Sequence, residues 1–97
     1  MDKIEKYREI IKKALLGLTE GSYAPYDIKN IEVFDDKTGI YIIVQKDFET
    51  ETINVLAFAE LTDAGKVLLQ DDSDDNIYDN LIKNGIEKTD IMNLYEQ

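Results

Sequence analysis

The sequence predicts an α+β fold in a single domain spanning residues 1–97. Apolar residues recur at helical spacing near the N-terminus and alternate further along the chain, so the period changes from that of a helix to that of a strand. Polar turns that end in glycine separate the alternating runs, and 97 residues suit one hydrophobic core. We therefore expect an N-terminal helix, an antiparallel four-stranded meander, a short C-terminal helix and a tail docked on the body.

Residues 3–18 are predicted to form an amphipathic helix, because apolar side chains recur along them at steps of three and four. Asp2 is the expected N-cap, and Glu5 stands three positions later, at the spacing of a capping box. Gly17 places the end of this helix nearby. The segment of residues 20–26 holds the only proline and is predicted to be a connecting loop.

Alternating and β-branched runs predict four strands over residues 28–34, 40–45, 52–62 and 66–70. Turns ending in Gly39 and Gly65 join the first strand to the second and the third to the fourth as hairpins. In the first strand, Ile31 and Val33 share one face. The third strand is apolar on both faces in its middle, so we expect it to be central or to lie under a helix.

An acidic segment precedes the second predicted helix, which runs from about residue 74 to residue 84 and ends at Gly85. Negative charge is favourable at a helix N-terminus, so capping is one reading of these aspartates, and contact with a basic partner is the other. The tail of residues 86–97 keeps Ile91, Leu94 and Tyr95 as apolar anchors. The acidic segment contributes Asp71, Asp72, Asp74 and Asp75.

The charge balance narrows the class of partner. Lys and Arg number 11 against 21 Asp and Glu, which gives a formal net charge of −10. Because DNA and RNA binding depends largely on basic contacts to phosphates, direct nucleic-acid binding is not expected. The acidity fits either solubility through mutual repulsion or a surface shaped for a basic protein partner.

Composition also indicates the compartment. The sequence has no cysteine, so disulfides and thiolate sites are excluded. Its N-terminus lacks the charged-then-apolar order of a signal peptide, and no apolar run approaches the ~20 residues that span a bilayer. A cytoplasmic protein without a membrane segment is therefore expected.

No catalytic or metal motif stands out. A calcium loop beginning at Asp71 would place Asn76 where glycine is needed and Ile82 where the bidentate glutamate belongs. Histidine and cysteine, the common zinc ligands and catalytic groups, are both missing. We expect neither enzyme activity nor a cofactor. A metal-assisted pair of carboxylates is the weakest of the alternatives that the sequence leaves open.

Tyrosine is enriched among the anchors of protein interfaces, and the chain has six. Tyr23 and Tyr26 on the proline loop and Tyr95 in the tail are candidate partner contacts, together with the four aspartates above. Tyr7 and Tyr41 fall on buried periods and are predicted to be core residues. Ordinary packing is the competing reading for every tyrosine.

Short motifs spread over most of the chain resemble the XisI-like family, named for a factor that controls excision of the fdxN element in cyanobacteria. The resemblance implies an α+β domain with a curved antiparallel sheet, no known catalytic activity, and an accessory role toward a DNA-acting, nuclease-like partner. It is carried by Tyr7-Arg8 with Ile10-Ile11, Val33-Phe34-Asp35, Tyr41, Gly65 to Gln70, Leu81, Gly85-Ile86, Lys88 and Asp90-Ile91.

The chain also departs from that family's pattern. Family members carry a Gly-Trp pair, paired arginines and a histidine near residues 46–59, whereas this chain has Glu51 and Thr52 at the arginine positions and Ala59 near the histidine position. Glu87 replaces the proline before the last segment. The changed charge affects which partner is attracted, so the fold transfers more directly than the function.

Two functions follow as hypotheses. The first is a non-enzymatic accessory or regulatory protein that binds a DNA-processing partner. The alternative is an acidic inhibitor, encoded by a phage or mobile element, that occupies the nucleic-acid groove of a defence nuclease. A homodimer is also expected, because so short a chain has a small core and its third strand is apolar on both faces.

Overall fold

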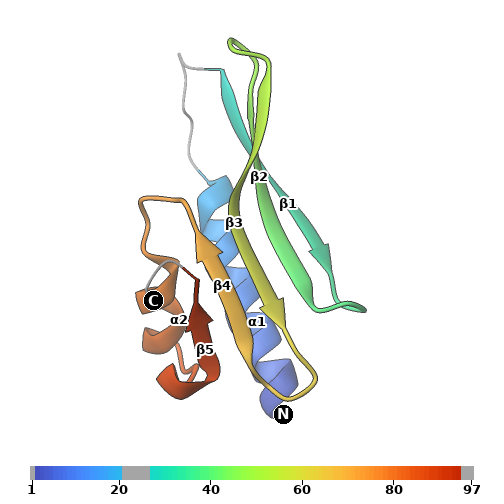
Figure 1. Ribbon diagram of the computed structural model, residues 1–97, viewed down its shortest axis with the longest axis vertical. Coiled ribbons are helices and arrows are strands. Elements are labelled where there is room, and N and C mark those ends of the chain that lie inside the picture. Colours follow the sequence, from blue (N-terminus) through green and yellow to red (C-terminus); the bar gives the residue numbers. More distant parts are fainter. Residues whose placement is uncertain (1, 21–26, 95–97) are drawn as a thin grey trace.

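The computed structural model describes residues 2–20 and 27–94, which form two helices packed on one five-stranded sheet (Figure 1). The strands follow the order β1-β2-β3-β4-β5 across the sheet, so β3 is central, as predicted. The elements are α1 Lys3–Leu16, the 3₁₀ turn η1 Gly17–Thr19, β1 Ile28–Asp35, β2 Ile40–Asp47, β3 Thr52–Leu61, β4 Val67–Asp71, α2 Ile77–Lys83, the 3₁₀ turn η2 Lys88–Asp90 and β5 Ile91–Asn93.

The sheet has a fifth strand, so the prediction of a four-stranded antiparallel meander is wrong. Strands β1 to β4 do form the meander, but β5 adds to β4 in parallel, with Ile91 opposite Val67. The predicted docked tail therefore includes a strand. Three residues are too few to show an alternating pattern, and β5 forms because the open edge of β4 offers unpaired backbone groups.

Side chains that cap backbone amides set where each helix begins. The Asp2 side chain accepts a hydrogen bond from the Glu5 amide at 2.8 Å, which confirms the predicted N-cap. Helix α1 ends two residues earlier than predicted and continues as a 3₁₀ turn. Helix α2 starts at Ile77 and not near residue 74, because Asn76 takes the left-handed conformation with φ 46° and caps the Asp79 amide.

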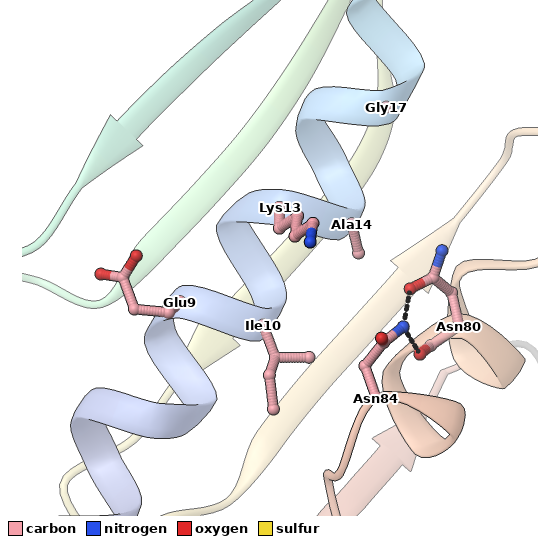
Figure 2. A pocket seen from close by; sticks show the side chains of 7 residues that line it. All are labelled: Glu9, Ile10, Lys13, Ala14, Gly17, Asn80 and Asn84. Carbon is pink, nitrogen blue, oxygen red and sulfur yellow. Dashed lines mark hydrogen bonds between the residues drawn. The ribbon is translucent and has the colours of Figure 1, made fainter. Parts of the chain in front are cut away.

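Both helices lie on the same face of the sheet, which we call the inner face (Figures 1 and 2). The opposite face is called the outer face. Among the described residues no helix is long and apolar enough to cross a membrane. The buried apolar core between the helices and the inner face consists of Tyr7, Ile11, Ala14, Leu15, Leu18, Tyr41, Ile43, Ala57, Ala59, Leu61, Val67, Leu69, Ile77, Leu81 and Ile86.

Strand β1 turns a polar residue inward. Asn30 is buried, and its amide donates to the Leu18 carbonyl at 2.8 Å and accepts from Gln45 Nε2 at 3.1 Å. These bonds tie the outermost strand to the end of the first helix. Ile31 and Val33 share a face as predicted, but that face is the outer one, and Val33 is 52% exposed.

The first hairpin depends on one glycine. Gly39 has φ 75°, its carbonyl accepts from the Leu61 amide at 2.8 Å, and a Cβ there would overlap the Leu61 carbonyl oxygen. Gly17 has an ordinary helical conformation, and nothing lies within 4 Å of the place of its Cβ. The two glycines therefore respond in opposite ways to the same added methyl group.

We predict that Gly39→Ala lowers the free energy of unfolding by at least about 2 kcal/mol, because it adds left-handed strain to a clash with backbone. Gly17→Ala is the matched control and should raise it by about 0.4–1 kcal/mol, because the unfolded chain loses conformational freedom. Urea unfolding of the wild type and the two variants measures both changes in the free energy of unfolding. Equal effects from the two substitutions would contradict this account of the hairpin.

Candidate protein-interaction site

A buried carboxylate near the end of the chain contacts the N-terminal helix α1. Asp90 is 6% exposed and accepts a hydrogen bond from the Tyr7 hydroxyl at 2.7 Å. Lys66 lies 2.8 Å from one of its oxygens and Lys3 lies 2.9 Å from the other. The Tyr7 hydroxyl in turn accepts from the Glu87 amide at 3.1 Å. Helix α1, the start of β4 and the segment before β5 therefore meet at one charge.

These contacts shift the ionisation of both groups. Hydrogen bonds from Lys66, Tyr7 and Lys3 hold the pKa of Asp90 well below its usual range. Burial, followed by the bond to Asp90, raises the pKa of Tyr7. Asp90 therefore stays ionised and Tyr7 stays protonated at neutral pH. A protonated phenol that already donates to a carboxylate is not a general base, so this cluster serves to hold the fold.

A second charged cluster fixes the other side of α1. Asp36 accepts from the Tyr41 hydroxyl at 3.0 Å and lies 3.0 Å from the Lys12 ammonium, while Arg8 donates to the same hydroxyl at 3.1 Å. The bond from Lys12, together with that from Tyr41, lowers the pKa of Asp36. The prediction that Tyr7 and Tyr41 are core residues is confirmed, since they are 3% and 0% exposed.

The acidic segment divides into one structural carboxylate and three exposed ones. Asp71 accepts from the Ser73 amide and from the Ile77 amide, each at 2.8 Å, so it holds the loop and the first turn of α2. The side chains of Asp72, Asp74 and Asp75 are exposed. We call these three the free acidic loop.

The structure therefore corrects one point about this segment. The N-cap of α2 is Asn76 and not one of the aspartates, although Asp71 does satisfy the helical amide of Ile77. The bonds of Asp71 give it a role in the fold that the other three aspartates lack. Among residues 2–20 and 27–94 no group of acidic side chains is arranged to hold a metal ion.

An open groove of about 370 Å³ runs between the two helices (Figure 2). In sequence, the α2 residues that line it follow the acidic segment. Ile10 and Ala14 of α1 and Gly17 of η1 form its apolar side. Asn80 and Asn84 form the α2 side, and the Asn84 amide donates to the Asn80 carbonyl and side-chain oxygens, each at 2.8 Å. This leaves the Asn80 amide nitrogen pointing away from Asn84 (Figure 2).

The groove is only partly enclosed, so a group bound in it would remain partly exposed to solvent. Glu9 and Lys13, four residues apart on α1, add one charge of each sign to its rim. This groove could not be recognised in the sequence. The only sign of it there is the pair of small residues Ala14 and Gly17, three positions apart, and such a pair is equally typical of a buried helix face.

Three of the seven partner contacts predicted from the sequence, Tyr23, Tyr26 and Tyr95, lie outside the described residues. Of the other four, Asp71 ends strand β4, and the remaining three lie in the loop before α2 with exposed carboxylates. The arrangement offers exposed negative charge before α2 and, separately, a groove between α1 and α2. Among the described residues it does not assemble a nucleophile, base and oxyanion site.

The comparisons with known proteins concern the whole chain. A family model described as "XisI protein" matches residues 1–97. A crystal structure from Anabaena variabilis, titled as the fdxN element excision controlling factor XisI, superposes with a TM-score of 0.79 at 18% identity, covering 99% of this chain and 89% of that one. A structure of a XisI-like protein from the same organism gives a TM-score of 0.79 at 22% identity, covering 92% and 84%.

At these identities the structural likeness establishes the fold alone. No functionally curated protein matches the sequence significantly.

We predict that Tyr7→Phe lowers the free energy of unfolding by about 1.5–3 kcal/mol, because it removes a hydrogen bond to a charged group. Tyr78→Phe is the matched control: Tyr78 packs against the core, and its hydroxyl has no hydrogen-bond partner among the described residues. Urea unfolding should separate the two variants. If both variants lose the same free energy of unfolding, the hydrogen bond of the Tyr7 hydroxyl does not stabilise the fold.

Asp90→Asn should change how stability depends on pH. The folded-state pKa of Asp90 is lowered, so its contribution is present above the unfolded value near 4 and is lost as the pH falls toward the folded pKa. The variant should therefore be less stable than the wild type at about pH 7, and the gap should narrow below about pH 4. Thermal unfolding across this range tests it, and a constant gap would contradict it.

Proposed function

Because the chain belongs to the XisI family, we propose that it is a non-enzymatic regulatory protein that acts by binding a DNA-processing, nuclease-like partner protein. The matched Anabaena structure is titled as a factor that controls excision of a DNA element. Excision requires a protein that cuts DNA, and a small regulator without a catalytic set of its own would act by contacting that protein. The family match over residues 1–97 carries this proposal.

The free acidic loop and the groove between the helices form the proposed contact surface. DNA-processing proteins present basic surfaces to phosphates, and exposed carboxylates attract such a surface. Asp72, Asp74 and Asp75 would steer the encounter, because long-range charge attraction acts mainly on the rate of association. The groove would then take a side chain of the partner between Ile10 and Asn80.

The net charge of −10 favours a second candidate. An acidic chain that presents carboxylates in place of phosphates would inhibit a nuclease by excluding its DNA. This inhibitor differs from an accessory factor in one measurable respect. DNA and an inhibitor of this kind compete for the nuclease, whereas an accessory factor forms a ternary complex with both.

The first test identifies the partner. Tagged protein is recovered from the cells that encode it, and mass spectrometry of the bound proteins should identify a DNA-acting enzyme. Recovery of metabolic enzymes alone would count against the proposal. The purified pair is then mixed with DNA, and competition or a ternary complex distinguishes the inhibitor from the accessory factor.

We predict that Asp72→Asn, Asp74→Asn and Asp75→Asn, combined in one variant, slow association with this partner on the order of tenfold at low salt. The free energy of unfolding should stay within about 0.5 kcal/mol, since all three side chains are exposed. Asp71→Ala should instead cost about 1 kcal/mol of stability, because it removes the acceptor for the Ile77 amide.

The matched control removes the same charge elsewhere, through Glu32→Gln, Glu49→Gln and Asp63→Asn in one variant. These three side chains are also exposed. If both triple variants slow association equally, the net charge acts and the loop has no special role. The association rate of each variant is measured by surface plasmon resonance at several salt concentrations, with the partner immobilised.

A further inference from the structure

The outer face of the sheet is covered by neither helix (Figure 1). Strand register shows which side chains share it, because residues directly opposite in paired strands point to the same face. Two neighbouring cross-strand rows are wholly apolar across β1, β2 and β3. They consist of Ile31, Val44 and Val55, and of Val33, Ile42 and Phe58, with Gln70 of β4 beside Phe58 in the second row.

These side chains belong to a separate surface and not to the core. None of the six is among the buried residues of the core or the side chains packed against it. Val33 is 52% exposed and Val55 is 45% exposed. Met92, on the same face of β5 beside Leu68, is 57% exposed. Contiguous exposed apolar surface of this kind marks an interaction site.

The charges on the outer face are separated by sign. At one end Lys29 lies directly opposite Lys46, and neither ammonium group has an ion pair among the described residues. At the other end, six residues along β1, Asp35 and Glu60 flank Ile40. The strand rise puts these two ends about 20 Å apart. The face is therefore neutral in sum, although the chain carries −10.

We propose that the outer face binds a second copy of this chain, related by a two-fold axis that runs across the strands between the two apolar rows. In an isologous pair the same patch meets itself, so this axis places the lysine end of each copy over the carboxylate end of the other. Lys46 then lies over Ile40 of the other copy, between its Asp35 and its Glu60. The apolar rows meet each other at the centre.

Charge argues for this occupant over a basic partner. A basic partner would be drawn to the strongly acidic remainder of the surface, and a neutral apolar face offers it no advantage. Two copies of a chain with charge −10 repel each other, so they can meet only where the local charge cancels. Pairing would also relieve the unfavourable contact between like charges at Lys29 and Lys46.

The area is sufficient for a dimer. The five strands have eight, eight, ten, five and three residues. With a rise of about 3.3 Å per residue and about 4.8 Å between strands, the plane of all five strands covers on the order of 500 Å². A specific interface needs at least about 500 Å² from each partner and more often about 800 Å², so the whole outer face must take part. The inference does not depend on the proposed function, and its test uses the purified chain alone.

Sedimentation equilibrium at micromolar concentration should give about twice the chain mass of 11.2 kDa. Val55→Lys should weaken self-association more than about tenfold, because it places a charge at the centre of the interface. Leu16→Lys is the matched control: this residue is 39% exposed on α1, away from the outer face, and the variant should remain dimeric. A monomeric wild type, or a dimeric Val55→Lys variant, would overturn the proposal.

A charge exchange tests the orientation and remains informative if Val55→Lys fails to fold. Lys46→Glu removes the repulsion with Lys29 within one copy, so the monomer should be no less stable, while self-association should weaken about tenfold. Adding Glu60→Lys should restore the dimer. If the double variant associates no better than Lys46→Glu alone, the two-fold arrangement is wrong.

Discussion

The carboxylate of Asp90 is the point on which the arrangement of this small protein depends. It accepts from Tyr7, 83 residues away in sequence, and pairs with Lys3 and Lys66. A buried charge is tolerated only when its partners satisfy it, so the N-terminal helix, the start of β4 and the segment before β5 must arrive together. The parallel strand β5 begins at the next residue, and its register on β4 follows from that position.

The two faces of the sheet then take different roles. The inner face and the two helices bury the apolar core, and the outer face leaves a second apolar surface with separated charges. A chain of this length buries a smaller fraction of its surface than a longer one, so a face that binds another copy is consistent with its size. The groove lies between the two helices on the inner side of the sheet, so a partner bound there would leave the outer face uncovered.

The sequence predicted the regular elements well and the candidate site in part. The first helix, its Asp2 cap and the two hairpins closed at Gly39 and Gly65 follow from local periodicity and turn residues, and the structure confirms them. The acidic residues before α2 were recognised, but the separate role of Asp71 was not. That role depends on where the Ile77 amide lies in space, six residues further on.

Sequence alone therefore determined the class of fold, the family resemblance and the acidic character, because these depend on residue types and short-range spacing. Only the tertiary structure decided that the tail adds a parallel strand, that Asn30 points inward while Val33 points outward, and which carboxylates remain free. Alternation identifies two faces of a strand but not which of them a helix will cover. That choice is made by contacts between residues far apart in sequence, of which Tyr7 with Asp90 is the clearest.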